Sequence, residues 1–527
     1  ITSSKPKNQY GLIIYVLICL HDTLVFYIII GNNNSKLRRR VMSRNLSRIL
    51  ILVVVFSLLL AGSMSALAQD QKVTVAVDAP PRTMDPHGSD ADSNLSVMSN
   101  FFEGLLQRNT KGELKPALAT SWERVDRLTW RFELRKGVKF HNGNDFTWED
   151  VEYTFEERLE NPEVSEFISF GSSIESVERV DGNDWVIDIT TTEPIPYFVQ
   201  NLHQVFIVDK ESTMERSQGD IGTKPIGTGP YVFEEWVKGS YLRMNANENY
   251  WEGEPEVQNA EIRPITEAST RLATISSGEV DILQGIPVTM YEAVENNSDL
   301  EVIARPSRRA IYLGLGNKED QPTSSLKVRK AMYMAINEKE LIDKVMFGHA
   351  TPAAQIPDPP TTGYSDQIDR LEYNPERAKE LLEEAGYGDG FSITLSAPND
   401  RYVQDEQIAS TIASYLSKVG IEVEVDAKPK SVYFEEVMNN ELEFYLIGWF
   451  DGSYDFGRSY SKLLHSVEEE TGYGTFNGAS YSDPVADQLY SVSKKVVDPE
   501  LRASILRDLN RLAMERVAVI PLHYQED

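Results

Sequence analysis

Cysteine is almost missing from this chain of 527 residues, which contains a single one, Cys19. Because Cys19 lies in an apolar stretch near the N-terminus, the rest of the chain has no disulfide, no cysteine nucleophile and no thiolate metal ligand. Histidine is also scarce, and the six histidines after residue 68 show no metal-ligand spacing, which argues against a dedicated metal site. These six are His87, His141, His203, His349, His465 and His523.

The sequence also lacks the common signatures of catalysis. It has no G-x-S-x-G elbow, no phosphate loop ending in Gly-Lys-Ser/Thr and no H-E-x-x-H helix. Gly227-Thr228-Gly229-Pro230 is similar to a phosphate cradle, but Pro230 has no N–H and no Lys-Ser/Thr follows, so we expect a structural turn. We predict that the protein is not an enzyme and has no cofactor; a secreted hydrolase, such as a peptidase, is the alternative from another class.

Basic residues are far fewer than acidic ones. The chain has 52 Lys and Arg against 81 Asp and Glu, which gives a net charge of −29. Residues 1–68 carry eight basic side chains and one acidic one, so the net charge of the remaining chain is −36. Such a field repels nucleic acid and anionic membrane surfaces, and we expect neither as a partner. Solubility explains the charge simply, and attraction of cationic ligands is the alternative.

The N-terminal region has the pattern of an export signal. After Met42 come two arginines, an almost unbroken aliphatic run over residues 49–60 and the small-x-small site Ala66-Leu67-Ala68. This pattern predicts a cleaved signal peptide over residues 42–68. Ser63 stands where a lipoprotein would have its lipidated cysteine, so we expect a periplasmic protein without a lipid anchor.

Residues 1–41 precede this signal, and we interpret them as a translated upstream extension. Residues 11–30 are an alternative, poor membrane segment that His21 and Asp22 interrupt.

The remaining chain changes character along its length. Residues 115–200 are rich in alternating strands, and Thr147 is expected to begin a helix that ends near Leu159. From about residue 314, helices and strands alternate, which predicts an α/β fold. Asn337 and Asn374 are each expected to begin a helix in this part.

The most informative stretch is residues 391–450, where two predicted strands are followed by charged and aromatic side chains. Arg401 and Tyr402 follow the first strand, and Trp449, Asp451 and Asp455 follow the last. Ligands of open α/β sheets bind beyond the carboxyl ends of the strands. A cation, an aromatic platform and two carboxylates at one sheet edge suit a zwitterionic ligand that bears an amine.

Each of these residues also has a simpler interpretation. Arg401 is equally well a solvated loop arginine, and Trp449 is equally well a core aromatic residue. Asp451 and Asp455 are also what a turn or a helix cap requires. The pattern by itself names no ligand.

A series of motifs spread over residues 72–527 resembles the family 5 extracellular solute-binding proteins, the dipeptide, oligopeptide and nickel receptors of ABC importers. The order and the spacing of these motifs carry the resemblance together. The motifs are Thr83-Met84-Asp85-Pro86-His87, Phe102-Glu103-Gly104-Leu105-Leu106, residues 116–122, 129–151 and 226–231, Asn249-Tyr250-Trp251, and residues 277–281, 328–331, 373–376 and 386–387.

The resemblance implies a type II periplasmic-binding-protein fold with two hinged lobes and an extra inserted N-terminal domain, the arrangement called cluster C. Lobe I would comprise residues 69–101, 223–312 and 501–527, the inserted α+β domain residues 102–222, and lobe II residues 313–500. Family members extend beyond Ile520-Pro521-Leu522, so we expect further residues after 527. Ligand would be buried between the lobes, and closure would signal an inner-membrane ABC permease.

One position departs from the family. Peptide-binding relatives read Trp-x-x-Asp-x-x-Asp-Pro, and their first aspartate accepts the amino terminus of the peptide. Here Gly452 stands at that position, with Asp451 one residue earlier and Phe456 in place of the proline. Arg401 matches the arginine that binds the ligand carboxylate in the dipeptide receptors.

We therefore predict a monomeric receptor for peptides or similar small solutes, in which Asp451 or Asp455 holds an ammonium and Arg401 a carboxylate. A receptor for a sugar, an opine or a metal chelate is the alternative within the family, with Trp449 and nearby tyrosines stacking on the ligand. A sensory or chaperone-like periplasmic protein with the same fold is a third hypothesis. The predicted ligand-binding residues are Arg401, Trp449, Asp451, Tyr454, Asp455, Arg82, Met84, Asn477 and Tyr481.

Overall fold

The computed structural model describes residues 13–20, 23–30 and 72–526, and it divides the chain into two units, residues 1–71 and 72–527. In the first unit, β1 (Ile13–Leu20) pairs with β2 (Thr23–Ile30) as an antiparallel ladder. The predicted signal peptide over residues 42–68 lies outside the described residues. Among the described residues, no helix has both the length and the apolar character that crossing a membrane requires.

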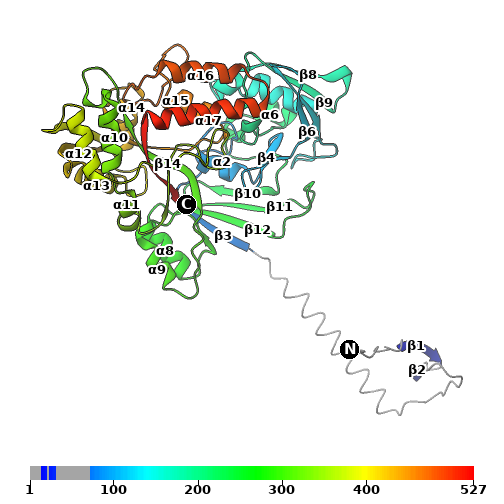
Figure 1. Ribbon diagram of the computed structural model, residues 1–527. Helices are drawn as coiled ribbons and strands as arrows, with labels where there is room; N and C mark the ends of the chain where they lie inside the picture. Colours follow the sequence, from blue (N-terminus) through cyan, green and yellow to red (C-terminus); the bar gives the residue numbers. More distant parts are fainter. Residues whose placement is uncertain (1–12, 21–22, 31–71, 527) are drawn as a thin grey trace, which may run out of the picture. The chain divides into compact units, whose positions relative to one another are not determined.

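A five-stranded sheet contains the first strand of the second unit (Figure 1). Its strands, in spatial order, are β10 (Tyr231–Val237), β11 (Tyr241–Ala246), β12 (Asn259–Pro264), β3 (Lys72–Val77) and β13 (Ile282–Leu283). β3 is parallel to both of its neighbours, and α8 (Ala268–Ser276) connects β12 to β13. α2 (Asp92–Met98) packs against this sheet through Leu95 and Met98, which share a core with Leu242.

A four-stranded antiparallel sheet forms from the predicted strand-rich region. Its order is β6 (Ala119–Arg124), β7 (Thr129–Leu134), β9 (Val186–Thr191) and β8 (Ile174–Arg179). Phe132 and Leu134 alternate into its core, as the sequence pattern predicts. Beside it lie the hairpin of β4 (Leu106–Arg108) and β5 (Leu114–Pro116), and several short helices, α4 (Ile168–Gly171), α5 (Phe198–Asn201), α6 (Lys210–Glu215) and α7 (Gln218–Ile221).

The helix predicted to begin at Thr147 is confirmed. Thr147 and Asp150 form a capping box in front of α3 (Trp148–Glu152). The chain then continues as a π-helical turn over Tyr153–Arg158 and ends near Leu159, as expected.

A six-stranded sheet forms from the second half of the chain. Its order is β15 (Ala350–Pro352), β19 (Val519–Glu526), β14 (Pro306–Leu315), β18 (Phe444–Trp449), β16 (Phe391–Pro398) and β17 (Ile421–Lys428). A large apolar core lies between this sheet and its helices. The helices of this region are α10 (Leu326–Ala335), α11 (Glu338–Lys344), α12 (Pro375–Glu384), α13 (Asp405–Ser417), α14 (Lys430–Met438), α15 (Phe456–Leu463), α16 (Pro484–Lys495) and α17 (Pro499–Glu515). The short helix α9 (Tyr291–Glu295) lies beside α8, and its buried side chains are not part of this core (Figure 1).

Two helix starts in this region are confirmed in detail. The side chain of Asn337 accepts a hydrogen bond from the N–H of Glu340, and that of Asn374 accepts one from the N–H of Arg377. Both asparagines are therefore N-caps, because they satisfy N–H groups that the first helical turn leaves without partners.

The structure differs from the predicted boundaries at the C-terminal end. Residues 501–527 were assigned to lobe I, but β19 pairs with β14 and β15 in the six-stranded sheet. Leu506 and Leu509 of α17 lie in the core of that same sheet. The sequence of an apolar strand does not say which of two sheets it joins, and the division of the chain into lobes stays a prediction.

Candidate ligand-binding site

The two loops selected from the sequence meet at one edge of the six-stranded sheet. β16 is parallel to β18, with Leu395 opposite Phe444, so both strands end at the same edge. The hydroxyl of Tyr402, in the loop after β16, donates a hydrogen bond of 3.1 Å to the carbonyl of Gly448 near the end of β18. This contact joins the two loops directly.

Arg401 lies in the loop after β16 and is exposed. Its backbone N–H donates to a carboxylate oxygen of Asp405, which fixes the loop to the start of α13. Its guanidinium carbon lies 5.5 Å from the ring centroid of Tyr402. The backbone is therefore held in place while the charged group remains in solvent.

Trp449 is the last residue of β18 and is half-buried. Its indole N–H donates to the hydroxyl of Ser459 at 3.1 Å, and its ring lies 5.4 Å from that of Phe476. The tryptophan thus packs at the boundary of the core.

Asp451 is buried, and the protein itself satisfies its carboxylate. One oxygen accepts from Arg458 at 3.0 Å and from the backbone and hydroxyl of Ser453, and the other accepts from the hydroxyl of Ser459 at 2.7 Å. Burial opposes ionisation, but Arg458 and the serine donors outweigh it, so the pKa of Asp451 lies below its usual value. Asp451 is therefore an ionised carboxylate with a full set of partners.

Asp455 is also buried and also paired. It caps α15 by accepting from the N–H of Gly457, and Arg502 of α17 contacts both of its oxygens, at 2.5 and 2.9 Å. An ionised carboxylate has about four acceptor positions, and these donors occupy three of those of Asp455. Both carboxylates are thus paired with arginines of the chain itself, and their role as the anchor of a ligand ammonium stays a prediction.

Tyr454 lies between two arginines that the sequence analysis did not identify. The guanidinium carbon of Arg308, in β14, lies 3.3 Å from the ring centroid, and that of Arg108, in β4, lies 3.7 Å from it. Tyr454 has a φ of +54°, a conformation that a tyrosine rarely adopts and that the flanking contacts stabilise. This stack brings the β4 hairpin against the loop after β18.

Gly452, the position where relatives have aspartate, lies against Gln204. A Cβ atom at Gly452 would lie 2.7 Å from the amide nitrogen of Gln204. The side chain of Gln204 thus occupies the space beside the backbone where an acidic side chain would begin. The sequence revealed the glycine but not the residue that approaches it, 248 positions earlier in the chain.

The other expected ligand-binding residues lie in different surroundings. Arg82 is exposed, and its guanidinium lies 3.8 Å from the carboxylate of Glu166. Met84 is completely buried in the core beside the five-stranded sheet. Asn477 and Tyr481 are buried and hydrogen-bonded to each other, and burial raises the pKa of Tyr481 to about 12. None of these four side chains makes a hydrogen bond or an ion pair with the described residues of the loop after β18.

A buried glutamate brings together three of the motifs that carried the resemblance. The carboxylate of Glu103 accepts from the hydroxyls of Thr228 and Tyr250 and from the indole N–H of Trp251, at 2.8 to 3.1 Å. Burial raises the pKa of Glu103. Gly227, in the segment similar to a phosphate cradle, packs against Phe101, where a Cβ would meet the backbone. These motifs are therefore structural, as expected for the glycine turn.

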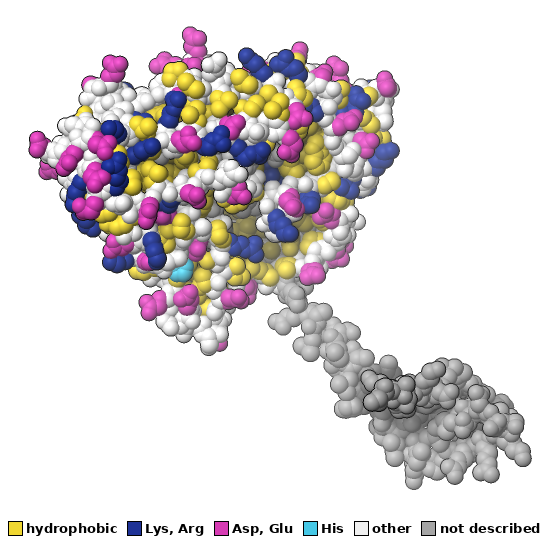
Figure 2. Space-filling view, viewed as in Figure 1, with side chains coloured by type: hydrophobic (Ala, Val, Ile, Leu, Met, Phe, Trp, Pro, Cys, Tyr) yellow, Lys and Arg dark blue, Asp and Glu magenta, His cyan; other side chains and the backbone are white. Residues whose placement is uncertain are grey.

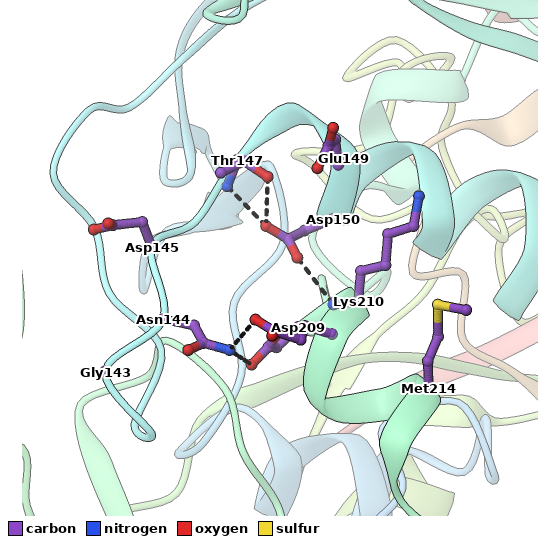
Figure 3. A pocket seen from close by; sticks show the side chains of 10 residues that line it. Gly143, Asn144, Asp145, Thr147, Glu149, Asp150, Asp209, Lys210 and Met214 are labelled. Carbon is purple, nitrogen blue, oxygen red and sulfur yellow. Dashed lines mark hydrogen bonds between the residues drawn. The ribbon is translucent and has the colours of Figure 1, made fainter.

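A separate cavity of about 560 Å³ lies between the loop before α3 and α6 (Figure 3). Half of its lining residues are acidic, and Asp150 and Asp209 are among them. Both are already used: Asp150 accepts from Lys210 N–H, and Asp209 accepts from the carboxamide of Asn144. Across the described ranges, no three His, Cys, Asp or Glu side chains are placed to hold a metal ion.

The molecular face in Figure 2 mixes basic and acidic side chains and is hollowed near its centre. Residues 113–470 match the family described as "Bacterial extracellular solute-binding proteins, family 5 Middle". The match covers more than half of the chain and includes both loops of the candidate site.

Individual proteins agree with this match over most of their length. The chain is 29% identical over 459 residues to the glutathione-binding protein GsiB of Salmonella choleraesuis, which covers 85% of this chain and 88% of that one. Among solved structures it is similar to the periplasmic binding protein DppA of Helicobacter pylori in complex with the peptide STSA. That likeness has a TM-score of 0.69 and 26% identity, and it covers 86% of this chain and 93% of DppA. NikZ of Campylobacter jejuni in complex with Ni(L-His) also matches, with a TM-score of 0.69, 23% identity and coverage of 87% and 93%.

Proposed function

The chain belongs to the family 5 bacterial extracellular solute-binding proteins, and from that premise we propose that it captures peptides or similar small solutes in the periplasm. Its fold is the type II periplasmic-binding-protein fold, and its function is that of a solute-binding receptor of an ABC importer. The single observation that carries the assignment is the family match across residues 113–470, which spans the meeting loops of the candidate site.

We assign the five- and four-stranded sheets to one lobe with its inserted domain and the six-stranded sheet to the other. This division is supported by the sheets themselves, which share no strand, and the stack of Arg108, Tyr454 and Arg308 is a contact between the two proposed lobes. Closure of the lobes then depends on how much better the solute binds the closed form than the open one.

Within the site, Arg401 is the proposed anchor of a ligand carboxylate, and Trp449 is the proposed aromatic contact. Tyr454 offers a ligand only the edge of its ring, because Arg308 and Arg108 cover its faces. The exposed guanidinium of Arg401 supports its role, since it has no carboxylate partner among the described residues. The protein acts as a monomer and has no catalytic activity. It works with an inner-membrane permease and not with nucleic acid, which agrees with its net charge of −29.

Ligands of relatives include glutathione, a peptide and a nickel–histidine complex, so the family leaves the solute class open. The pairing of Asp451 and Asp455 with arginines favours a second candidate, a solute without a free amine, such as an opine, a sugar or a metal chelate.

Native mass spectrometry of the freshly purified protein tests the receptor function. We expect a bound small molecule that is released on denaturation and can be identified. Adding that molecule at about 100 times its Kd stabilises the fold by about 2.7 kcal/mol, which a thermal melt measures. A protein that carries nothing, and whose melting temperature no peptide, sugar, opine or chelate raises, would contradict the proposal.

A further inference from the structure

Tyr454 belongs to the proposed lobe that contains the six-stranded sheet, and contacts within that lobe hold it in place. Its carbonyl accepts a hydrogen bond of 3.0 Å from the N–H of Thr362, and one face of its ring lies against Arg308. Arg308 is itself fixed by Asp358, to which it donates two hydrogen bonds of 2.7 and 3.0 Å. The ring of Tyr454 is therefore presented to the other lobe from a firmly held position.

Arg108, in the lobe with the inserted domain, covers the other face of the same ring. Its guanidinium carbon lies 3.7 Å from the ring centroid of Tyr454. Its terminal nitrogens donate to the carbonyls of Gly112 and Gln200 and to the side-chain oxygen of Gln200, at 2.5 to 3.0 Å. The orientation of Arg108 is thus set within its own lobe, and its contact with Tyr454 is that of a cation against an aromatic face.

Gly112 brings the turn between β4 and β5 against the edge of the Tyr454 ring. It has a φ of +79°, and a Cβ atom at this position would lie 2.6 Å from Cε1 and 2.7 Å from the hydroxyl oxygen of Tyr454. Glycine suits both the left-handed backbone and the close approach. The β4 hairpin therefore meets Tyr454 twice, with a guanidinium on the ring face and a glycine at the ring edge.

This contact can break without leaving many polar groups unpaired. If the lobes separate, Arg308 keeps Asp358, and Arg108 keeps the oxygen atoms that orient it. The Nε of Arg108 is buried without a hydrogen-bond partner, which opposes the contact and keeps it weak. A cation–π contact changes an equilibrium constant by about two- to thirtyfold, which is enough to shift the populations of two forms without locking either of them.

We propose that Arg108, Gly112 and Tyr454 form a latch that stabilises the closed arrangement of the two lobes before any solute binds. This inference rests on the proposed receptor function and adds a determinant of affinity to it. Arg108 and Gly112 are positioning residues: they raise the affinity for every solute by the same factor, because a larger share of the protein is in the binding-competent form. They do not select one solute over another.

The latch is tested by measuring the distance between the lobes in the ligand-free protein. Spin labels are attached at Glu178→Cys in β8 and Glu376→Cys in α12, which are exposed positions in different lobes. Cys19→Ser removes the one natural cysteine of the chain, so only these two positions are labelled. Double electron–electron resonance then reports the populations of short and long distances. We expect both populations in the protein with the natural latch.

Gly112→Ala places a methyl group against the Tyr454 ring, and Gly137→Ala is the matched control. Gly137 has a φ of +77°, so an alanine there has the same backbone strain, but its Cβ would meet nothing within 4 Å. We expect Gly112→Ala to lower the short-distance population about threefold or more, and Gly137→Ala to leave it unchanged. An unchanged population in Gly112→Ala, an equal loss in both variants, or no short-distance population in the natural latch overturns the proposal.

The cation is tested with Arg108→Met, and Arg127→Met is its control. Arg127 is an exposed arginine between β6 and β7, so its substitution makes the same change in charge. We expect only Arg108→Met to lower the short-distance population. Tyr454→Phe keeps the ring and should keep the population, whereas Tyr454→Ala should lower it. If Arg108→Met lowers only the melting temperature and leaves the distances unchanged, Arg108 has a purely structural role and the latch is refuted.

Failure of the latch and failure of the receptor function give different results. Recovery of a bound solute from the purified protein, with the same distances in all of these variants, supports the receptor function and overturns the latch. Distances that shift as expected in a protein that carries no solute support the latch and contradict the receptor function.

Discussion

The loops after β16 and β18 end at the same edge of one sheet, yet they use their charges in opposite ways. Arg401, after β16, is exposed and makes no ion pair with a described residue. Asp451 and Asp455, after β18, are buried and bound to arginines of the chain itself. A charged residue at the end of a strand is therefore a ligand contact only if the rest of the fold leaves it without a partner.

The largest expected effect comes from breaking the ion pair between Asp455, in the loop after β18, and Arg502. Asp455→Ala leaves the buried guanidinium of Arg502 without its carboxylate, and we expect a loss of about 3–5 kcal/mol in the free energy of unfolding. Urea unfolding measures it. The matched control, Asp508→Ala, breaks an exposed pair with Arg511 and should cost about 0–1 kcal/mol. Equal losses in the two variants would refute the contrast between buried and exposed pairs.

A second effect concerns pH. The pKa of Asp451 is lowered in the folded protein, so its ionised form stabilises the fold above the unfolded pKa of about 3.9, and this contribution is lost as the pH falls through the folded value. We expect Asp451→Asn to be less stable than the natural protein by about 1.5–3 kcal/mol at pH 7. The difference should shrink below about pH 4 in urea titrations across a pH series. A difference that stays constant with pH would show that Asp451 is not ionised.

A smaller effect is expected at Gly452. Gly452→Asp restores the residue type of the peptide-binding relatives, and only the end of the flexible Gln204 side chain must move to admit it. We expect a loss of less than about 1.5 kcal/mol in stability and a gain in binding of Ala-Ala. Gly452→Asn, which has the same shape without the charge, is the control and should show no such gain. An equal gain in both variants would mean that charge is not responsible.

The smallest effect on stability is expected at Arg401. Arg401→Ala removes an exposed side chain whose backbone is held independently, so the free energy of unfolding should change by less than about 0.5 kcal/mol. Calorimetry should nevertheless show binding of a ligand carboxylate weakened at least tenfold. Unchanged affinity would exclude Arg401 from the site and leave the ligand carboxylate to other donors.

Local structure was predictable from the sequence because its causes lie within a few residues. The caps at Asn337 and Asn374, the capping box at Thr147 and the alternation in β7 are each decided by neighbours within one turn or one strand. The meeting of the two loops was also predictable, because adjacent parallel strands end at one edge of a sheet.

The sequence by itself thus determined the family, the elements and the edge of the sheet where the candidate site lies. Only the tertiary structure decided which charges at that edge have partners. Arg502 lies 47 residues from Asp455, and Arg308 lies 143 residues from the carbonyl of Asp451 that it contacts. Pairing of this kind depends on which segments the packed core brings together, and neither periodicity nor residue type records it.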